Sequence, residues 1–204
     1  MTKLIDYKSY EAEILKPIFQ EKMIDPFIAN LVESFIYKEI IKYDRNGNIV
    51  EKYMIKYGIK DGLYEKWYGN GQKEKECNYK DGKIEGILHV WYPMDLAENG
   101  QKWSETNYKE GKKDGLCQSW HKNGQKMCEC TYKDGKLEGL WQTYYSNGQK
   151  EKECNYKENE KEGFYQSWHK NGKKRVECTY KNGKVEGFYQ AWDENGQIIC
   201  EFIK

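Results

Sequence analysis

Seven cysteines and three histidines are the residues of this 204-residue chain best suited to chemistry. Paired thiols form disulfides, clusters of thiolates hold zinc, and a histidine beside a serine or cysteine activates it as a nucleophile. Each of these chemistries requires the side chains to converge within a few ångströms. The spacing of the residues along the chain decides whether they can meet.

The cysteines follow a period that keeps them apart. Cys130, Cys154 and Cys178 recur every 24 residues, and with two strands per period neighbours should lie about 10 Å from each other. A disulfide needs Cα atoms within about 7 Å, and zinc needs sulfurs about 2.3 Å from one ion. Cys128 and Cys130 form a Cys-x-Cys pair, but no second pair completes a site. We therefore predict small apolar filler, with no metal site and no cofactor.

The histidines are separated in the same way. His121 and His169 fill the same slot of the segment Trp-His-Lys-Asn-Gly, two periods and about 20 Å apart. His89 lies in a different column. Residues related by a repeat cannot meet at one point, so no Ser/His/Asp or Cys/His arrangement is supported. We expect no catalytic residue and no enzyme.

A repeat sets the elements that position all these residues. Asn-Gly recurs with spacings of 24, 29, 24, 24, 24 and 24, and a second glycine column shares the one irregular spacing. The two columns are Gly47, Gly71, Gly100, Gly124, Gly148, Gly172 and Gly196, and Gly62, Gly86, Gly115, Gly139, Gly163 and Gly187. A fixed period of about 20 to 50 residues is typical of an array of stacked units.

Each unit carries two turn signals, as at Asp134-Gly135 and Asn147-Gly148. Both dipeptides suit two-residue type I′ hairpin turns, which predicts two short antiparallel strands per unit. The expected fold is mainly β, an elongated solenoid or meander of stacked β-hairpins over residues 41–204, with about six 24-residue units. Residues 1–40 lack the repeat, and Asp25-Pro26 predicts a helix start. We expect a short N-terminal α-helical cap there, with a partner-binding element as the alternative.

Two-residue turns would fix which side chains share a face of the sheet. Trp141 would pair with Cys154, Tyr144 with Glu151, and Ser146 with Gln149. The cysteine and tyrosine columns then share one face, the thiol face, which is expected to be the core. The opposite face, the tryptophan face, carries a Leu row (Leu63, Ile87, Leu116, Leu140, Phe164 and Phe188) and a Trp row (Trp67, Trp91, Trp120, Tyr144, Trp168 and Trp192).

The tryptophan face is the candidate partner-binding surface. Aromatic side chains among polar groups are typical of binding surfaces, although a single-layer sheet also needs aromatics on both faces to exclude water. Both interpretations remain open. Besides the Trp row, the candidates are Glu105, Glu129 and Glu153, which would make the face acidic and suited to a basic partner. Five extra residues within 93–98 predict a loop, which adds Pro93, Met94, Asp95 and Leu96.

The charges of the chain nearly cancel, with 34 Lys+Arg against 33 Asp+Glu. Residues 132–155 alone hold four lysines and four acids, so an extended positive groove for nucleic acid or anionic membrane is disfavoured. No apolar stretch is long enough for a transmembrane helix, and charge appears too early at the N-terminus for a secretion signal. With an odd number of cysteines, a cytoplasmic location with free thiols is expected.

The units resemble the MORN-repeat variant family of bacteria. The resemblance rests on the pattern Tyr-Lys-Asp-Gly-Lys-x-Glu-Gly followed by apolar and aromatic positions and Asn-Gly, which is clean in the units starting at Tyr132 and Tyr180. It covers roughly residues 44–204, and Asn159 replaces the turn glycine in one unit. The family implies elongated hairpin arrays that bind other molecules and have no catalytic residues of their own.

Many bacterial members of that family resemble the YwqK-type antitoxins. The resemblance therefore implies a protein partner, with an antitoxin, immunity protein or inhibitor of a toxic effector enzyme such as a nuclease as the first hypothesis. The alternative is a scaffold or assembly module that self-associates or docks at a membrane. The extra loop and the Trp row are where the partner is expected to bind.

Overall fold

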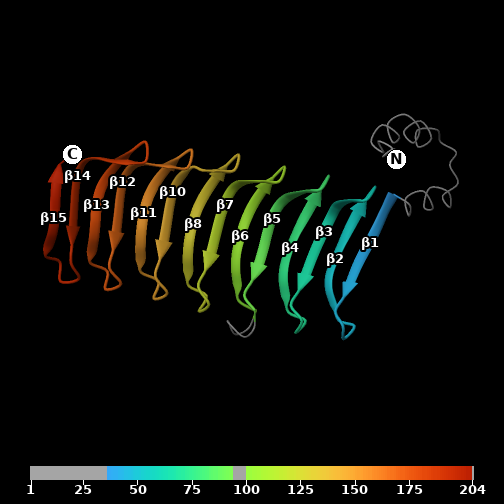
Figure 1. Cartoon of the computed structure of the whole chain (residues 1–204). Coiled ribbons are helices and arrows are strands. Elements are labelled where there is room, and N and C mark those ends of the chain that lie inside the picture. Colours follow the sequence, from blue (N-terminus) through green and yellow to red (C-terminus); the bar gives the residue numbers. More distant parts are fainter. Residues whose placement is uncertain (1–35, 94–99, 204) are drawn as a thin grey trace, which may run out of the picture.

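The computed structural model describes residues 36–93 and 100–203, and their strands form one open antiparallel sheet. The strands lie side by side in chain order, except that β9 and β10 both pair with β8, so β1 and β15 are at opposite ends (Figure 1). They are β1 (Tyr37–Tyr43), β2 (Ile49–Lys56), β3 (Ile59–Trp67), β4 (Lys73–Lys80), β5 (Lys83–Trp91), β6 (Lys102–Lys109), β7 (Lys112–Trp120), β8 (Lys126–Lys133), β9 (Lys136–Leu137), β10 (Gly139–Tyr144), β11 (Lys150–Lys157), β12 (Glu160–Trp168), β13 (Lys174–Lys181), β14 (Lys184–Trp192) and β15 (Ile198–Ile203). The predicted meander of hairpins is confirmed.

The N-terminal part expected to be a helical cap falls almost entirely outside the described residues. Its last residues are the exception, because 37–40 belong to β1. Tyr37 pairs with Lys56 of β2, and the pairing continues along the strand. The sheet therefore begins before residue 41, where the array was expected to start.

The Asp-Gly turns have the predicted type I′ conformation. Asp134 and Gly135 have φ angles of 51° and 85°, and Lys133 pairs with Lys136 across them. The turn is also tied to the preceding unit. The Gly135 N–H donates to the Lys113 carbonyl at 2.8 Å, and the Asp134 N–H donates to the carboxylate just before Gly115 at 3.0 Å. The acid that precedes each of the first five glycines of the second column holds the next turn in place in the same way.

Asn159 fills the turn position that holds glycine in the other type I′ turns, with φ at 74°. Its Oδ1 accepts a hydrogen bond from the Leu137 N–H at 2.6 Å. We expect Asn159→Ala to lower the free energy of unfolding by about 2 kcal/mol, because alanine keeps the unfavourable φ and loses the hydrogen bond. Asn159→Gly should cost less, since glycine removes the strain. Urea denaturation followed by circular dichroism measures both, and equal losses would contradict the prediction.

The prediction of two-residue turns at Asn-Gly is wrong. At Asn147-Gly148 only the glycine has a positive φ, of 85°. The Tyr145 N–H donates to the Gln149 carbonyl at 2.8 Å and the Gly148 N–H to the Tyr145 carbonyl at 2.9 Å, which is a three-residue loop ending in a left-handed glycine. The Asn147 side chain stabilises it, because Oδ1 accepts the Gln149 N–H at 3.1 Å and Nδ2 donates to the Lys170 carbonyl of the next unit at 3.2 Å.

The longer loop changes the register at the end of each hairpin. The centre has the predicted pairing, with Trp141 opposite Cys154. Tyr144, however, pairs with Lys150 rather than with Glu151, because a bulge intervenes. Glu151 consequently lies on the thiol face, and Lys150 lies on the tryptophan face.

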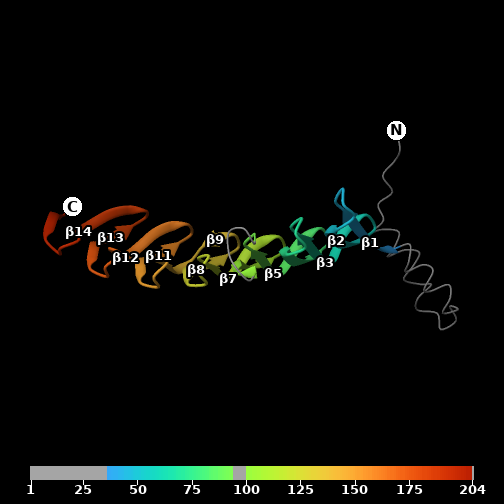
Figure 2. The ribbon, with the colours of Figure 1, turned by 90° about the horizontal axis from the view of Figure 1, so that it is seen from below.

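The thiol face is the core, as predicted. Cys154 is fully buried between Trp141 and Tyr165 of the neighbouring strands, and Tyr156 packs edge-on against Trp141 with ring centroids 6.0 Å apart. Large rings on both sides cover a small thiol, which lets one layer of strands bury a core. The sheet is a narrow band of curved hairpins when viewed from below (Figure 2). The other nearly buried thiols of the column are Cys77, Cys130 and Cys178.

Candidate partner-binding face

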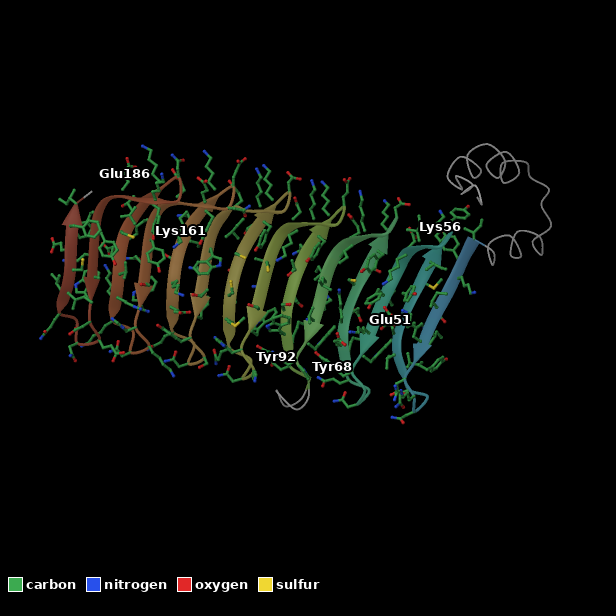
Figure 3. All side chains as sticks on the ribbon, viewed as in Figure 1. Glu51, Lys56, Tyr68, Tyr92, Lys161 and Glu186 are labelled. Atoms are coloured by element: carbon green, nitrogen blue, oxygen red, sulfur yellow. The ribbon has the colours of Figure 1, made fainter. Side chains whose placement is uncertain are left out.

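The Trp row occupies the last position of its strands, just before the Asn-Gly loops, and its side chains are half-buried. Its carbonyls accept hydrogen bonds from the preceding unit. Tyr68 donates to Trp91 at 2.8 Å, and His121 Nε2 donates to Tyr144 at 2.7 Å. Tyr68 and Tyr92 lie near the edge of the sheet that carries these loops (Figure 3). The same bond joins Tyr92 to Trp120, Tyr145 to Trp168 and His169 to Trp192.

These bonds explain why either tyrosine or histidine fills this slot at positions 68, 92, 121, 145 and 169. Either side chain places a donor at its tip, and the donor reaches the main chain of the next unit. The slot of His121 and His169 therefore joins neighbouring units. The backbone carbonyls of the Trp row are held by these hydrogen bonds, and its rings are half-buried. The row therefore also helps to hold neighbouring units together.

The glutamates of the tryptophan face are paired with lysines, which corrects the prediction of an acidic face. Lys150 reaches Glu153 at 2.5 Å, and its ammonium lies 5.6 Å from the ring centroid of Trp168 in the next unit. Gln142 donates to the same carboxylate at 2.5 Å. The bulge before each loop brings the lysine onto this face. The equivalent pairs are Lys73–Glu76, Lys102–Glu105, Lys126–Glu129 and Lys174–Glu177.

Pairing with lysine makes these glutamates sensitive to acid. The hydrogen bond from Lys150 and then that from Gln142 hold the pKa of Glu153 below its usual range, and lysine acts in the same way on Glu129 and Glu177. A carboxylate with a lowered folded pKa stabilises the fold above its unfolded pKa. That stabilisation is lost as the pH falls through the folded pKa.

We therefore expect the urea midpoint of the protein to drop as the pH falls below about 4.5. In Glu153→Gln and in Lys150→Met this drop should be shallower, each pair contributing roughly 0.5 kcal/mol because it is partly exposed. Denaturation curves at several pH values between neutral and acid give the slope. If both variants keep the slope of the parent chain, the pairs do not carry the acid sensitivity.

The Leu row is exposed along the array, in contrast to the Trp row. Leu140 lies on the tryptophan face with Gln142, because the two residues are two positions apart in an unbroken register. One such side chain per unit gives a stripe about 50 Å long, with neighbours about 10 Å apart. Each member is between 36% and 48% exposed: Leu63, Ile87, Leu116, Leu140, Phe164 and Phe188. Aligned exposed apolar side chains are typical of an interaction surface.

The extra loop between β5 and β6 is described only at its base. Pro93 is half-buried, whereas Met94, Asp95 and Leu96 lie outside the described residues. The base is closed by the Tyr92 N–H, which donates to the Gln101 carbonyl at 3.0 Å. The structure therefore places the base of the loop at the same edge of the sheet as the Asn-Gly loops.

Trp103 was not among the expected candidates, although it lies beside that loop. It is 45% exposed, and its ring centroid is 6.3 Å from that of Tyr92. A signal was present in the sequence, because Trp103 stands in a slot that holds no aromatic residue in the units on either side. The slot is otherwise filled by Val50, Glu74, Met127, Glu151, Arg175 and Ile199.

Thiols meet in one hairpin, which corrects the prediction that the period keeps all of them apart. Cys117 of β7 lies directly opposite Cys130 of β8, and Cys128 is two residues away on the same strand. The period separates cysteines of one column, but the register brings two columns together here. In the described ranges, no group of three or more His, Cys, Asp or Glu side chains is arranged to hold a metal ion.

Four segments of the chain match the family model of the MORN repeat variant: residues 60–81, 113–134, 137–158 and 161–182. Each segment ends at the first residue of a type I′ turn, so the match follows the hairpin unit. These four units are MORN repeats. The hairpin of β5 and β6, with its extra loop, and the last hairpin continue the sheet without a match of their own. No curated protein matches the chain.

The MORN repeats indicate a repeat-based binding protein, because repeats of this family are generally binding units without catalysis. The geometry is compatible with that role. Lysines and glutamates pair with each other along the tryptophan face of the sheet, and the exposed apolar side chains of the Leu row line up on the same face. Across the described residues, no helix combines the length and the apolar character needed to span a membrane.

Proposed function

We propose that this MORN-repeat protein is a non-enzymatic binding array that holds another protein along its Leu row. The observation that carries the proposal is the exposure of six apolar side chains in line, one per unit, on an otherwise charge-paired face. Leaving them in water is unfavourable by roughly 25 cal/mol per Å² of apolar surface, so a partner that covers them gains affinity.

The partner's surface is expected to be apolar rather than basic. Glu76, Glu105, Glu129, Glu153 and Glu177 of the tryptophan face already have lysine partners, so a strongly basic surface would gain little and would meet the lysines as well. An elongated partner element, such as a helix or an extended segment, suits a row about 50 Å long with one contact about every 10 Å.

Within this function, we propose neutralisation of a toxic effector enzyme, as an antitoxin or immunity protein. The support is the resemblance of the repeat pattern to antitoxin-like bacterial arrays, together with the exposed Leu row, which offers contacts to a protein surface. A toxin active site covered by the array would be blocked by exclusion of its substrate.

Capture from the host of this protein tests the proposal. The full chain is immobilised and incubated with host extract at low and high salt, with and without nuclease digestion, and bound proteins are identified by mass spectrometry. A protein that stays bound at high salt and after digestion supports an apolar interface. Retention that disappears on nuclease digestion would point to nucleic acid instead. If the captured protein is an enzyme, the array should reduce its activity when added in equal amount.

Self-association is the second candidate function, and β15 favours it. All residues of this edge strand are exposed, and Ile198, Ile199 and Ile203 are 54%, 67% and 84% exposed. An apolar edge strand with unpaired backbone groups is a template for pairing with another chain. Sedimentation velocity across a range of concentrations distinguishes this function, because a binder of other proteins should stay monomeric.

A further inference from the structure

The thiols of the β7–β8 hairpin differ from the others in the array. Elsewhere the residue opposite a buried cysteine is an aromatic one, as Trp141 is opposite Cys154. In this hairpin Cys117 lies directly opposite Cys130. Opposed residues of antiparallel strands have Cα atoms about 4.5 or 5.5 Å apart. Both separations lie within the range of about 4.4 to 6.8 Å that a disulfide requires.

The two thiols are unequal in access and in electrostatics. Cys117 is half-buried, whereas Cys130 is 4% exposed. A hydrogen bond with Cys130, a further one with Thr106 Oγ1 at 3.3 Å and the charge of Lys113 hold the pKa of the Cys117 thiol below its usual range, against the effect of burial. The pKa of Cys130 is raised, by its hydrogen bonds with Cys117 and Cys128 and then by burial. Thiolate character and access thus coincide at Cys117.

We propose that Cys117 and Cys130 form an oxidation site, at which a peroxide such as hydrogen peroxide converts the two thiols into a cross-strand disulfide. This site goes beyond the proposed binding function, since it needs no partner protein. It lies near the middle of the array, where the bond would tie β7 to β8.

The reaction proceeds in two balanced steps. The Cys117 thiolate attacks one oxygen of the peroxide, the O–O bond breaks, and the second oxygen leaves as hydroxide, which takes up the proton lost by Cys117 to form water. Cys117 then carries a sulfenic acid. The sulfur of Cys130 attacks the sulfenic sulfur, the S–O bond breaks, and the hydroxyl leaves with the Cys130 proton as a second water. Two thiols are oxidised by two electrons, and one peroxide is reduced.

Cys128 is the competing partner for Cys130, because it is also half-buried and its pKa is lowered by the neighbouring Cys130 thiol. Their Cα atoms are two residues apart on one strand, or about 6.6 Å, at the upper limit of the disulfide range. A bond between them would also close a small ring within an extended strand. The directly opposed pair therefore fits the disulfide geometry better than the Cys-x-Cys pair does.

Treatment of the reduced full chain with hydrogen peroxide at neutral pH tests the site. We expect the loss of two of the seven free thiols, with the intact mass lowered by two hydrogens and a peptide map that joins Cys117 to Cys130. The reaction should slow as the pH falls and the thiolate is protonated. Dithiothreitol should restore all seven thiols.

Two variants keep the experiment decisive. Cys200→Ser removes an exposed thiol of β15 and should leave the cross-link unchanged. Cys117→Ser, at the more accessible position, should abolish the cross-link while the circular dichroism spectrum stays that of the parent chain. A map that joins Cys128 to Cys130, a disulfide between two chains through Cys200, or a cross-link that persists in Cys117→Ser would overturn the proposal.

Discussion

Replacing Cys154 by aspartate should destabilise the array by more than about 3 kcal/mol, the largest stability effect that we expect from one substitution. Cys154 is 0% exposed and lies between Trp141 and Tyr165, with the ring of Tyr156 close by. A carboxylate in that position would be desolvated by these rings, and the nearby charge of Lys161 would offset only part of that cost, so the group would be protonated or exposed by local unfolding. Since each unit contacts only its neighbours, the loss should be concentrated in β10, β11 and β12.

Cys200→Asp provides the matched control. The same change is made on β15, where the cysteine is exposed, so the urea midpoint should move little. Hydrogen exchange of the Cys154→Asp variant should show faster exchange at the strands around residue 154 than in β2 to β5. If the two variants have equal midpoints, the thiol column is not the core of this sheet.

The type I′ turns and the core could be predicted because each is decided within one unit. Asp134-Gly135 accepts two positive φ angles, which a type I′ turn requires, and a type I′ turn matches the twist of a hairpin. The pairing of Trp141 with Cys154 follows from the alternation of side chains. Small thiols beside large rings then identify the buried face without knowledge of the rest of the array.

The Asn-Gly loops could not be predicted in this way, because a contact between units decides them. Asn-Gly is compatible with a two-residue turn and with a three-residue loop. Asn147 stabilises the longer one by donating to the Lys170 carbonyl of the following unit. A single unit, read by itself, does not contain that acceptor. A two-residue turn would put Lys150 on the face opposite Glu153 and leave the tryptophan face acidic, whereas the three-residue loop brings the two side chains together.

The meeting of Cys117 and Cys130 was accessible from the sequence but was missed. The two residues pair in the same register as Gln118 and Glu129, one step further from the loop. Comparing cysteines only along the 24-residue period hides contacts across a hairpin. The exposure of the Leu row is different, since it follows from the absence of a second layer over the described strands.

Replacing Leu140 and Phe164 together by aspartate is expected to weaken partner binding by about 30- to 1000-fold. The two side chains are adjacent members of the Leu row and are 46% and 48% exposed. Apolar anchors at the centre of an interface contribute about 1 to 2 kcal/mol each, and two carboxylates would add a desolvation cost when a partner covers them. Stability should change little, because both residues are already in contact with water. Isothermal titration calorimetry with the captured partner measures the affinity, and urea denaturation checks the fold.

The control for this variant removes as much exposed apolar surface from outside the row. Ile59 and Ile199 are 44% and 67% exposed, and their joint replacement by aspartate should leave the affinity within about twofold. If the Leu row binds the partner, the Leu140 and Phe164 variant should lose much of its affinity and the Ile59 and Ile199 variant almost none. Equal losses in both would mean that exposed apolar surface anywhere on the array contributes, and no loss in either would place the partner on the Asn-Gly edge near Trp103. Because the row has one member in each of six successive units, moving the pair of substitutions along it should also show where the partner begins and ends: pairs beneath the partner lower the affinity, and pairs beyond its reach leave it unchanged.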